Sequence, residues 1–327
     1  MKRHLFFFVS FLFINFFTIN VFAASVDPLP SWNDGNNKQS IIRFVNAVTD
    51  KNNTAFLPVA NRIATIDNDG TLWVEKPMYT QFIFMFERIK TLAKTDPALA
   101  KNNAILPILQ GKYDQLTDKD LQQLFALTSS GMSVEAYNQT VTDWLAHAIN
   151  PRFKKHYTQL IYQPMLEVIQ YLHDNQFQVY IVSGGGQEFI RTFSNNTYHI
   201  ERNHVLGSTT KMKYSDNNHS PQLIKKAEPL FICDKEGKPM AINLLIGQKP
   251  VIAFGNSDGD RQMLEWTQSN ASALKLMVLI HHDDAVREFA YGAKSKVGTF
   301  SDSLMREAKE QKWNVVSMKD DWRVVFP

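Results

Sequence analysis

Residues 63–71 read Ile-Ala-Thr-Ile-Asp-Asn-Asp-Gly-Thr, an apolar run that ends in two aspartates separated by one residue. Side chains alternate along a strand, so Asp67 and Asp69 leave the end of this strand on the same side. Two carboxylates this close repel each other unless a positive charge lies between them. Mg²⁺ is the usual solution, because it takes oxygen ligands from one or two carboxylates and from a substrate phosphate.

The same pair of carboxylates suits phosphoryl transfer. One carboxylate can attack phosphorus, while the other exchanges protons with the leaving group and with water. A strand followed by a plain polar turn is the alternative interpretation, because Asp-Gly is a common turn dipeptide. The rest of the chain favours the chemical interpretation.

The chain begins with the pattern of a secretory signal. Lys2 and Arg3 precede an apolar run from Leu5 to Ala23, whose last residues form a small-residue cleavage site. An uncleaved membrane anchor is the alternative, since about 18 apolar residues nearly span a bilayer. We expect residues 1–23 to be a cleaved signal peptide, which predicts a periplasmic or secreted protein without stable membrane insertion.

Composition limits the function of the mature chain. Removal of residues 1–23 leaves 304 of the 327 residues, enough for one large core and a smaller module. The single cysteine, Cys233, forbids a disulfide within the chain and is interpreted as structural. The net charge of +3 falls to +1 once Lys2 and Arg3 are removed. That balance gives no electrostatic case for nucleic acid as a partner.

Hydrophobic periodicity divides the mature chain into three parts. Residues 24–60 combine a turn-rich stretch with one helical pattern, and the first strand follows near 61–67. Only helical patterns occur from 78 to 157. Strand patterns then alternate with helices up to the end of the chain, with a hairpin expected around 216–218. This alternation predicts an α/β fold with a mostly parallel sheet and right-handed crossovers.

Three further motifs follow predicted strands or begin predicted helices. Ser183 comes directly after an apolar strand and precedes three glycines, an arrangement that can hold phosphate or can be a turn without a ligand. Lys238 begins a helix, where a cation opposes the helix dipole unless it binds an anion. The sequence Gly255-Asn-Ser-Asp-Gly-Asp260 offers two carboxylates and an amide oxygen, which suits a hard cation.

In order, these four motifs resemble those of the haloacid dehalogenase (HAD) superfamily, in particular an exported bacterial branch similar to phosphoserine phosphatases. Residues 30–35 and 281–288 also resemble that branch. The resemblance implies a doubly wound, Rossmann-type three-layer core with strand order 5-4-1-2-3. It also implies a helical cap inserted after the first strand. We therefore expect the core to comprise 61–77 and 158–327, and the cap 78–157.

The resemblance also implies roles for single residues. Asp67 would be the nucleophile that forms an aspartyl-phosphate, and Asp69 would protonate the leaving oxygen and later activate water. The phosphoryl oxygens would be held by Ser183, Gly184 and Lys238. The Mg²⁺ ligands would be Asp67, the Asp69 carbonyl, Asn256 and Asp260. Many family members carry Asp where this chain has Asn256, so Asp258 stays an alternative metal ligand.

Other candidate residues are weaker. Lys249 competes with Lys238 for the third motif, but it precedes a strand and is expected far from the site. His281 and His282 end a strand at the correct edge, and their expected role is scaffold. Glu75 lies near the position where relatives use a carboxylate to contact substrate, and an exposed turn charge is the alternative.

Together these features predict an exported, Mg²⁺-dependent phosphatase that acts on small phosphomonoesters through a phospho-aspartate. A dehalogenase needs neither Asp69 nor Asp260. A phosphotransferase shares every residue named, and only its products distinguish it. From another class, an inactive exported binding protein would keep the fold and lose motif residues, which this chain retains apart from the question of Asn256.

Overall fold

The computed structural model describes residues 26–102, 105–217, 219–271 and 274–327. The expected signal peptide and its cleavage site lie outside these residues. Within the described ranges, no helix has both the length and the apolar character needed to span a membrane.

A seven-stranded sheet in the order β4-β3-β2-β1-β5-β6-β7 forms the centre of the molecule. Every neighbouring pair is parallel except β3 and β4, which are antiparallel. The expected five-strand order is confirmed as β3-β2-β1-β5-β6, and β4 and β7 extend it at the two edges. The strands are β1 (Ile63–Ile66), β2 (Gln178–Gly186), β3 (Val205–Asn217), β4 (Ser220–Phe231), β5 (Ile252–Gly255), β6 (Leu276–His281) and β7 (Asn314–Ser317).

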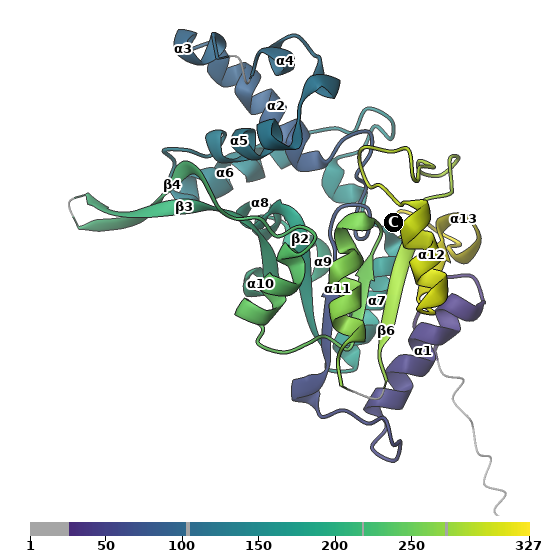
Figure 1. Ribbon diagram of the computed structural model, residues 1–327. Helices are drawn as coiled ribbons and strands as arrows, with labels where there is room; N and C mark the ends of the chain where they lie inside the picture. Colours follow the sequence, from purple (N-terminus) through teal and green to yellow (C-terminus); the bar gives the residue numbers. More distant parts are fainter. Residues whose placement is uncertain (1–25, 103–104, 218, 272–273) are drawn as a thin grey trace, which may run out of the picture.

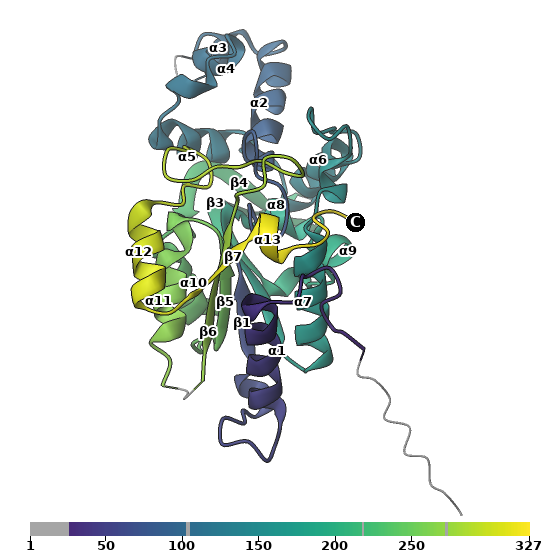
Figure 2. The same cartoon turned by 90° about the vertical axis from the view of Figure 1, so that its right-hand side faces the viewer.

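Helices cover both faces of this sheet and give the expected three layers (Figure 2). One face carries α10 (Gly237–Leu245), α11 (Arg261–Gln268) and α12 (Asp302–Glu310), and the other carries α1 (Asn36–Thr49) and α7 (Gln163–Asp174). The central strands β1 and β5 are buried along their whole length, as apolar strands covered on both faces should be. The doubly wound α/β fold is therefore confirmed.

A helical layer lies over the carboxyl ends of the strands (Figure 1). Its helices are α2 (Thr80–Ala93), α3 (Pro97–Ala100), α4 (Leu106–Leu109), α5 (Asp118–Leu127) and α6 (Val134–Leu145). These helices lie within the segment 78–157 that the sequence predicts to be a cap. Phe84 of this layer packs on Phe189 of α8 (Gln187–Arg191), with ring centroids 5.7 Å apart.

The β3–β4 hairpin also takes part in this layer. Its outer half projects beyond the sheet, beneath the helical layer (Figure 1). The backbone N–H of Lys225 donates to the Met132 carbonyl, and the N–H of Gly131 donates to the Lys225 carbonyl, both at 2.9 Å. The sequence predicted a hairpin at this place but not its pairing with the helical segment.

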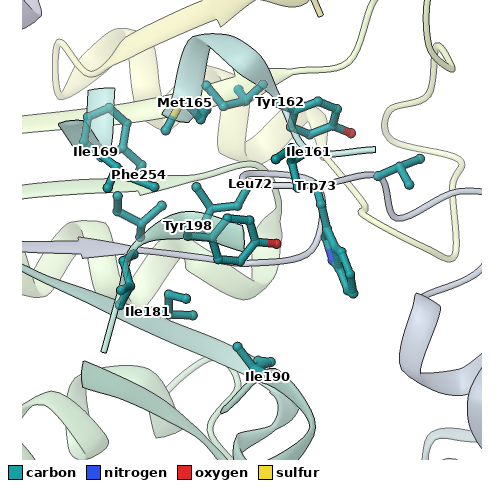
Figure 3. Close-up of a cluster of buried hydrophobic side chains, with 14 of the residues drawn as sticks. Leu72, Trp73, Ile161, Tyr162, Met165, Ile169, Ile181, Ile190, Tyr198 and Phe254 are labelled. Atoms are coloured by element: carbon teal, nitrogen blue, oxygen red, sulfur yellow. The ribbon is translucent and has the colours of Figure 1, made fainter. Parts of the chain in front are cut away.

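Packing fixes the loop that follows β1. Leu72 and Trp73 lie among buried side chains of β2, β5, α7 and α9 (Ser194–Tyr198), as Figure 3 shows. Trp73 is fully buried and stacks on Phe193, with ring centroids 4.6 Å apart. Because its indole also reaches Asp69, the hydrophobic core positions the polar residues directly before it. The remaining short helix, α13 (Met318–Asp321), lies near the carboxyl terminus.

Candidate active site

Lys238 brings three segments of the chain together at the carboxyl ends of β1, β2 and β5. Its ammonium group donates to Asp67 Oδ1 at 2.6 Å, to Asp260 Oδ1 at 2.5 Å and to the Val182 carbonyl at 2.8 Å. All three side chains are buried. The helix that starts at Gly237 therefore places Lys238 against two carboxylates. Their negative charges offset the unfavourable interaction between Lys238 and the positive end of the helix dipole.

Burial and neighbouring charge shift the protonation of this cluster. Burial, together with the negative charge of Asp260, raises the pKa of Asp67 well above its ordinary value. Burial alone would lower the pKa of Lys238, but Asp260 and Asp67 raise it above its ordinary value. Lys238 is therefore a fixed cation, and it engages only Oδ1 of Asp67 among the described contacts. Oδ2 is left for a reacting partner.

Asp69 is oriented by the tryptophan that follows it. The Trp73 indole N–H donates to Asp69 Oδ1 at 2.9 Å. The other oxygen, Oδ2, is directed toward Gly185, where it lies 3.5 Å from the position that a Cβ atom would occupy. Burial raises the pKa of Asp69 above its ordinary value. A raised pKa suits a group that gives a proton and later takes one.

The glycine run after Ser183 extends β2 rather than beginning a helix at once. Strand pairing with β3 resumes at Gly186 and Ser208 after an irregularity, so Ser183 and Gly184 lie inside the strand. The expectation that Ser183 comes directly after the strand is therefore wrong. Ser183 Oγ accepts the Gly185 N–H at 3.1 Å, and Gln81 Oε1 of the helical layer accepts the Gly186 N–H at 2.6 Å.

Asp260 organises the loop that contains it. Its Oδ2 accepts the Asn256 N–H at 2.9 Å, the Ser257 N–H at 3.0 Å and the Ser257 hydroxyl at 3.2 Å. Its Oδ1 accepts from Lys238, so both oxygens are engaged. Asp258 turns away from this cluster, because its Oδ1 accepts from the Ser301 hydroxyl at 2.8 Å and a third of its side chain is exposed.

Asn256 and Glu75 are in direct contact. The Asn256 side-chain amide donates to Glu75 Oε1 at 2.7 Å, while its own Oδ1 accepts from Thr71 Oγ1 at 3.3 Å. The Tyr291 hydroxyl donates to the same Glu75 oxygen at 2.6 Å. Glu75 is buried, which raises its pKa well above its ordinary value. The exposed turn charge that the sequence left open for Glu75 does not occur.

Two glycines make room for this contact. Gly70 has φ +78° and Gly298 has φ +63°, a region that favours glycine. A Cβ atom at Gly70 would lie 2.0 Å from Asn256 Nδ2, and one at Gly298 would lie 1.8 Å from Glu75 Oε1. Any larger residue at either position would displace the Asn256–Glu75 pair.

The residues present fit a hard divalent cation. Asp67, Glu75 and Asp260 are buried and Asp69 is half-buried, and Lys238 is the one cation in contact with this group among the described residues. That places four carboxyl groups against one cation, and their oxygens are the donors that a hard cation prefers. In the described part of the chain, no cluster of three or more His, Cys, Asp or Glu side chains has metal-ligating geometry. A cation at this edge would be held by Asp67 together with the Asp69 carbonyl, Asn256 Oδ1 and water.

The remaining candidates surround the site or lie outside it. His282 contacts the Gly70 carbonyl through Nε2 at 2.7 Å and Glu288 through Nδ1 at 3.1 Å, which is the expected scaffold role. His281 lies 3.7 Å from Asp283 instead. Lys249 binds the Ser269 carbonyl and hydroxyl, away from the other motif residues. Cys233 is buried, and burial raises the pKa of its thiol to about 12.

Three residues that contact the site were not predicted from the sequence. Tyr291 holds Glu75, Trp73 holds Asp69, and Gln81 holds Gly186. Trp73 follows Asp69 by four positions, and its place just after the first motif was a usable signal. Tyr291 and Gln81 meet their partners only through tertiary contacts.

The fold and the site together place a cluster of carboxylates at the carboxyl edge of a doubly wound α/β sheet. The family model of haloacid dehalogenase-like hydrolases matches residues 64–265. The chain therefore belongs to the haloacid dehalogenase-like hydrolases.

Several solved structures are similar to this chain at low sequence identity. A conserved protein of unknown function from Anaerococcus prevotii is 15% identical with a TM-score of 0.57, and the match covers 89% of this chain and 94% of that one. A phosphoserine phosphohydrolase-like protein from Francisella tularensis is 18% identical with a TM-score of 0.40, covering 78% and 94%. A probable phosphoserine phosphatase from Vibrio cholerae is 16% identical with a TM-score of 0.38, covering 79% and 69%. No curated protein matches the chain.

Proposed function

We propose that this chain is an exported, Mg²⁺-dependent phosphatase that hydrolyses small phosphomonoesters through a phospho-aspartate at Asp67. The observation that carries the proposal is the contact of Lys238 with both Asp67 and Asp260 at 2.6 and 2.5 Å. This contact screens the nucleophile from its neighbouring carboxylates and leaves its second oxygen unengaged. The Ser183–Gly186 segment lies beside it, where a phosphoryl group can be held.

The reaction proceeds in two displacements. Asp67 Oδ2 attacks phosphorus, and the bond from phosphorus to the leaving oxygen breaks as Asp69 gives that oxygen its proton. A water molecule then attacks the phosphorus of the aspartyl-phosphate, and Asp69 takes a proton from it. Inorganic phosphate leaves, and Asp67 is restored as a carboxylate.

The surrounding residues hold charge and orientation. Lys238, Ser183 and the Gly184 backbone would hold phosphoryl oxygens. Mg²⁺, bound by Asp67, the Asp69 carbonyl and Asn256 Oδ1, would neutralise the charge of the phosphate. Asp260 remains a candidate ligand, but in the described arrangement it orders the Asn256–Asp260 loop and holds Lys238.

Two related functions use overlapping residues. Dehalogenation requires no acid two residues after the nucleophile, and the placement of Asp69 by Trp73 favours chemistry that moves protons. Transfer of the phosphoryl group to another acceptor uses the same site. Analysis of products in the presence of added alcohols separates transfer from hydrolysis.

Export is proposed from the order of basic, apolar and small residues at the start of the chain. The intact mass of the protein from a periplasmic fraction tests it. A mass that lacks residues 1–23 is expected, and a mass that retains them contradicts cleavage.

The activity is tested with the mature protein, residues 24–327, on a panel of phosphomonoesters with and without Mg²⁺. Phosphate release that depends on Mg²⁺ is expected. No release from any member of the panel, or release unaffected by a chelator, contradicts the proposal. Lys249→Met serves as a control, because Lys249 lies outside the site and its loss should leave the activity unchanged.

A further inference from the structure

A small hollow continues from the glycine run toward the helical layer. Its lining comes from α5, α6, α8 and the β3–β4 hairpin, and it includes Ser129, Tyr137, Gly186, Glu188, Ser208 and Lys225. Gly186 ends the run that begins at Ser183, and Asp69 Oδ2 is directed at the preceding Gly185. The hollow is therefore next to the site where the scissile phosphate is proposed to bind.

Lys225 presents a buried cation to this hollow. The residue is 3% exposed, and its Nζ lies 5.1 Å from the centroid of the Tyr137 ring. Across the described chain, its ammonium group makes no hydrogen bond or ion pair, and its one described contact is the cation–π contact with Tyr137. Burial lowers the pKa of Lys225, and the negative charge of Glu188 offsets this only in part.

The carboxylate nearest in the lining is already engaged. Glu188 pairs with Arg191 at 2.8 Å and with Arg202 at 3.5 Å. Glu188 is thus neutralised by two arginines, and these with Lys225 give three cations to one carboxylate in this region. An anionic group of a ligand would therefore bind Lys225 without displacing a hydrogen-bond or ion-pair partner among the described residues.

The backbone holds Lys225 at the junction of two parts of the fold. Both its N–H and its carbonyl are paired at 2.9 Å, with Met132 and Gly131 of the helical layer. The position of the ammonium group therefore depends on the hairpin and the helical layer lying together. In this arrangement the hollow measures about 10 Å³, room for roughly one water molecule, so a larger group enters while the two parts are apart.

We propose that Lys225 is a specificity residue that binds a second anionic group of the substrate, a carboxylate or a second phosphate, while the scissile phosphate occupies the Asp67 site. This inference rests on the proposed phosphatase function and names its class of substrate. The chemistry required is a small phosphomonoester that carries another negative charge a few bonds away. Binding of this second anionic group requires the helical layer to shift so that the hollow enlarges beside Lys225, which lies on the hairpin.

Matched substrates test the inference. Glycerol 3-phosphate and 3-phosphoglycerate differ by one carboxylate, and fructose 6-phosphate and fructose 1,6-bisphosphate differ by one phosphate. We expect the wild-type protein to prefer the member with the extra anion in at least one pair. Lys225→Met should lower kcat/KM for that member by about 10- to 100-fold, the usual value of a hydrogen bond to a charged group.

Controls separate recognition from folding. Lys226→Met removes a neighbouring exposed cation and should change kcat/KM less than about twofold. Lys225→Arg keeps the charge and should retain part of the preference. The substrate pair in which Lys225→Met selectively lowers kcat/KM shows whether the second anionic group is a carboxylate or a phosphate. An equal loss for both members of a pair, or a wild-type protein without any preference, overturns the inference.

The inference and the proposed function fail in different ways. Hydrolysis of all four compounds with no selective effect of Lys225→Met overturns only the inference. If neither these compounds nor the rest of the phosphomonoester panel are hydrolysed, the phosphatase proposal fails, and calorimetric binding of 3-phosphoglycerate and glycerol 3-phosphate decides the role of Lys225. Tighter binding of the carboxylate member by the wild type but not by Lys225→Met supports the role, and equal binding overturns it.

Discussion

The side-chain amide of Asn256 donates to Glu75 Oε1 across 2.7 Å, and both residues are buried. A neutral residue of the Gly255–Asp260 loop is thus held by a carboxylate that lies 181 positions earlier in the chain. Because Nδ2 is committed to Glu75, Oδ1 is the atom of Asn256 left for a cation. Partners of this kind orient metal ligands and strengthen binding.

Moving the negative charge from Glu75 to position 256 tests the contact between the two side chains. Asn256→Asp removes the donor and places a second carboxylate against Glu75, so the free energy of unfolding without Mg²⁺ should fall by about 1–3 kcal/mol. Glu75→Gln in the same chain restores a donor and acceptor in reversed order and should recover most of the loss. Urea unfolding measures both variants. Equal stability of the single and double variants would show that the contact is not formed in solution.

The prediction for Asp69 concerns proton transfer. Asp69→Asn keeps the contact with the Trp73 indole but can neither give nor take the proton, so turnover should slow by roughly 10²- to 10⁴-fold. The loss should be smaller with aryl phosphates, whose leaving groups need less protonation. Steady-state rates on alkyl and aryl phosphates measure the difference. An identical loss on both would remove Asp69 from the role of general acid.

The motif residues were predictable because each lies at the end of a strand or the start of a helix. Asp67, Lys238 and Asn256 meet in the structure as their order along the chain implied, since parallel strands place their carboxyl ends at one edge. Local sequence patterns were therefore enough to identify most residues of this cluster. The doubly wound core followed from the same alternation of strands and helices.

The contacts that surround the cluster could not be predicted in this way. Tyr291 reaches Glu75 across 216 positions, and Gln81 reaches Gly186 across 105. Neither residue has a local pattern that marks it, because each acts only through tertiary packing. The pairing of Lys225 with Met132 is of the same kind, and it depends on how far the hairpin extends.

Movement of the helical layer relative to the hairpin is tested by locking the two together. Ser133 and Ile224 are bridge partners across this junction, so cysteines at both positions should form a disulfide. We expect the oxidised double variant to lose most turnover and the reduced form to regain it, because substrate enters when the layer opens. Ser133→Cys alone is the control. Full activity of the oxidised form would exclude a moving lid at this junction.

Cys233 should be inert in the folded protein. Burial raises the pKa of its thiol to about 12, so the reactive thiolate is scarce at neutral pH and becomes abundant only as the pH approaches that value. Alkylation at pH 7–8 should therefore modify no thiol in the native protein and one after unfolding in urea. Rapid alkylation of native protein at neutral pH would contradict the buried position.

The most direct test of the central claim is the site of phosphorylation during turnover. The protein is mixed with Mg²⁺ and a radiolabelled phosphomonoester, quenched in acid within the first turnover, digested and examined by mass spectrometry. The account predicts one phosphoryl group on the peptide that contains Asp67, labile to hydroxylamine as an acyl phosphate is, and absent in Asp67→Asn. Turnover that continues in Asp67→Asn, or a phosphoryl group found on another residue, would contradict it.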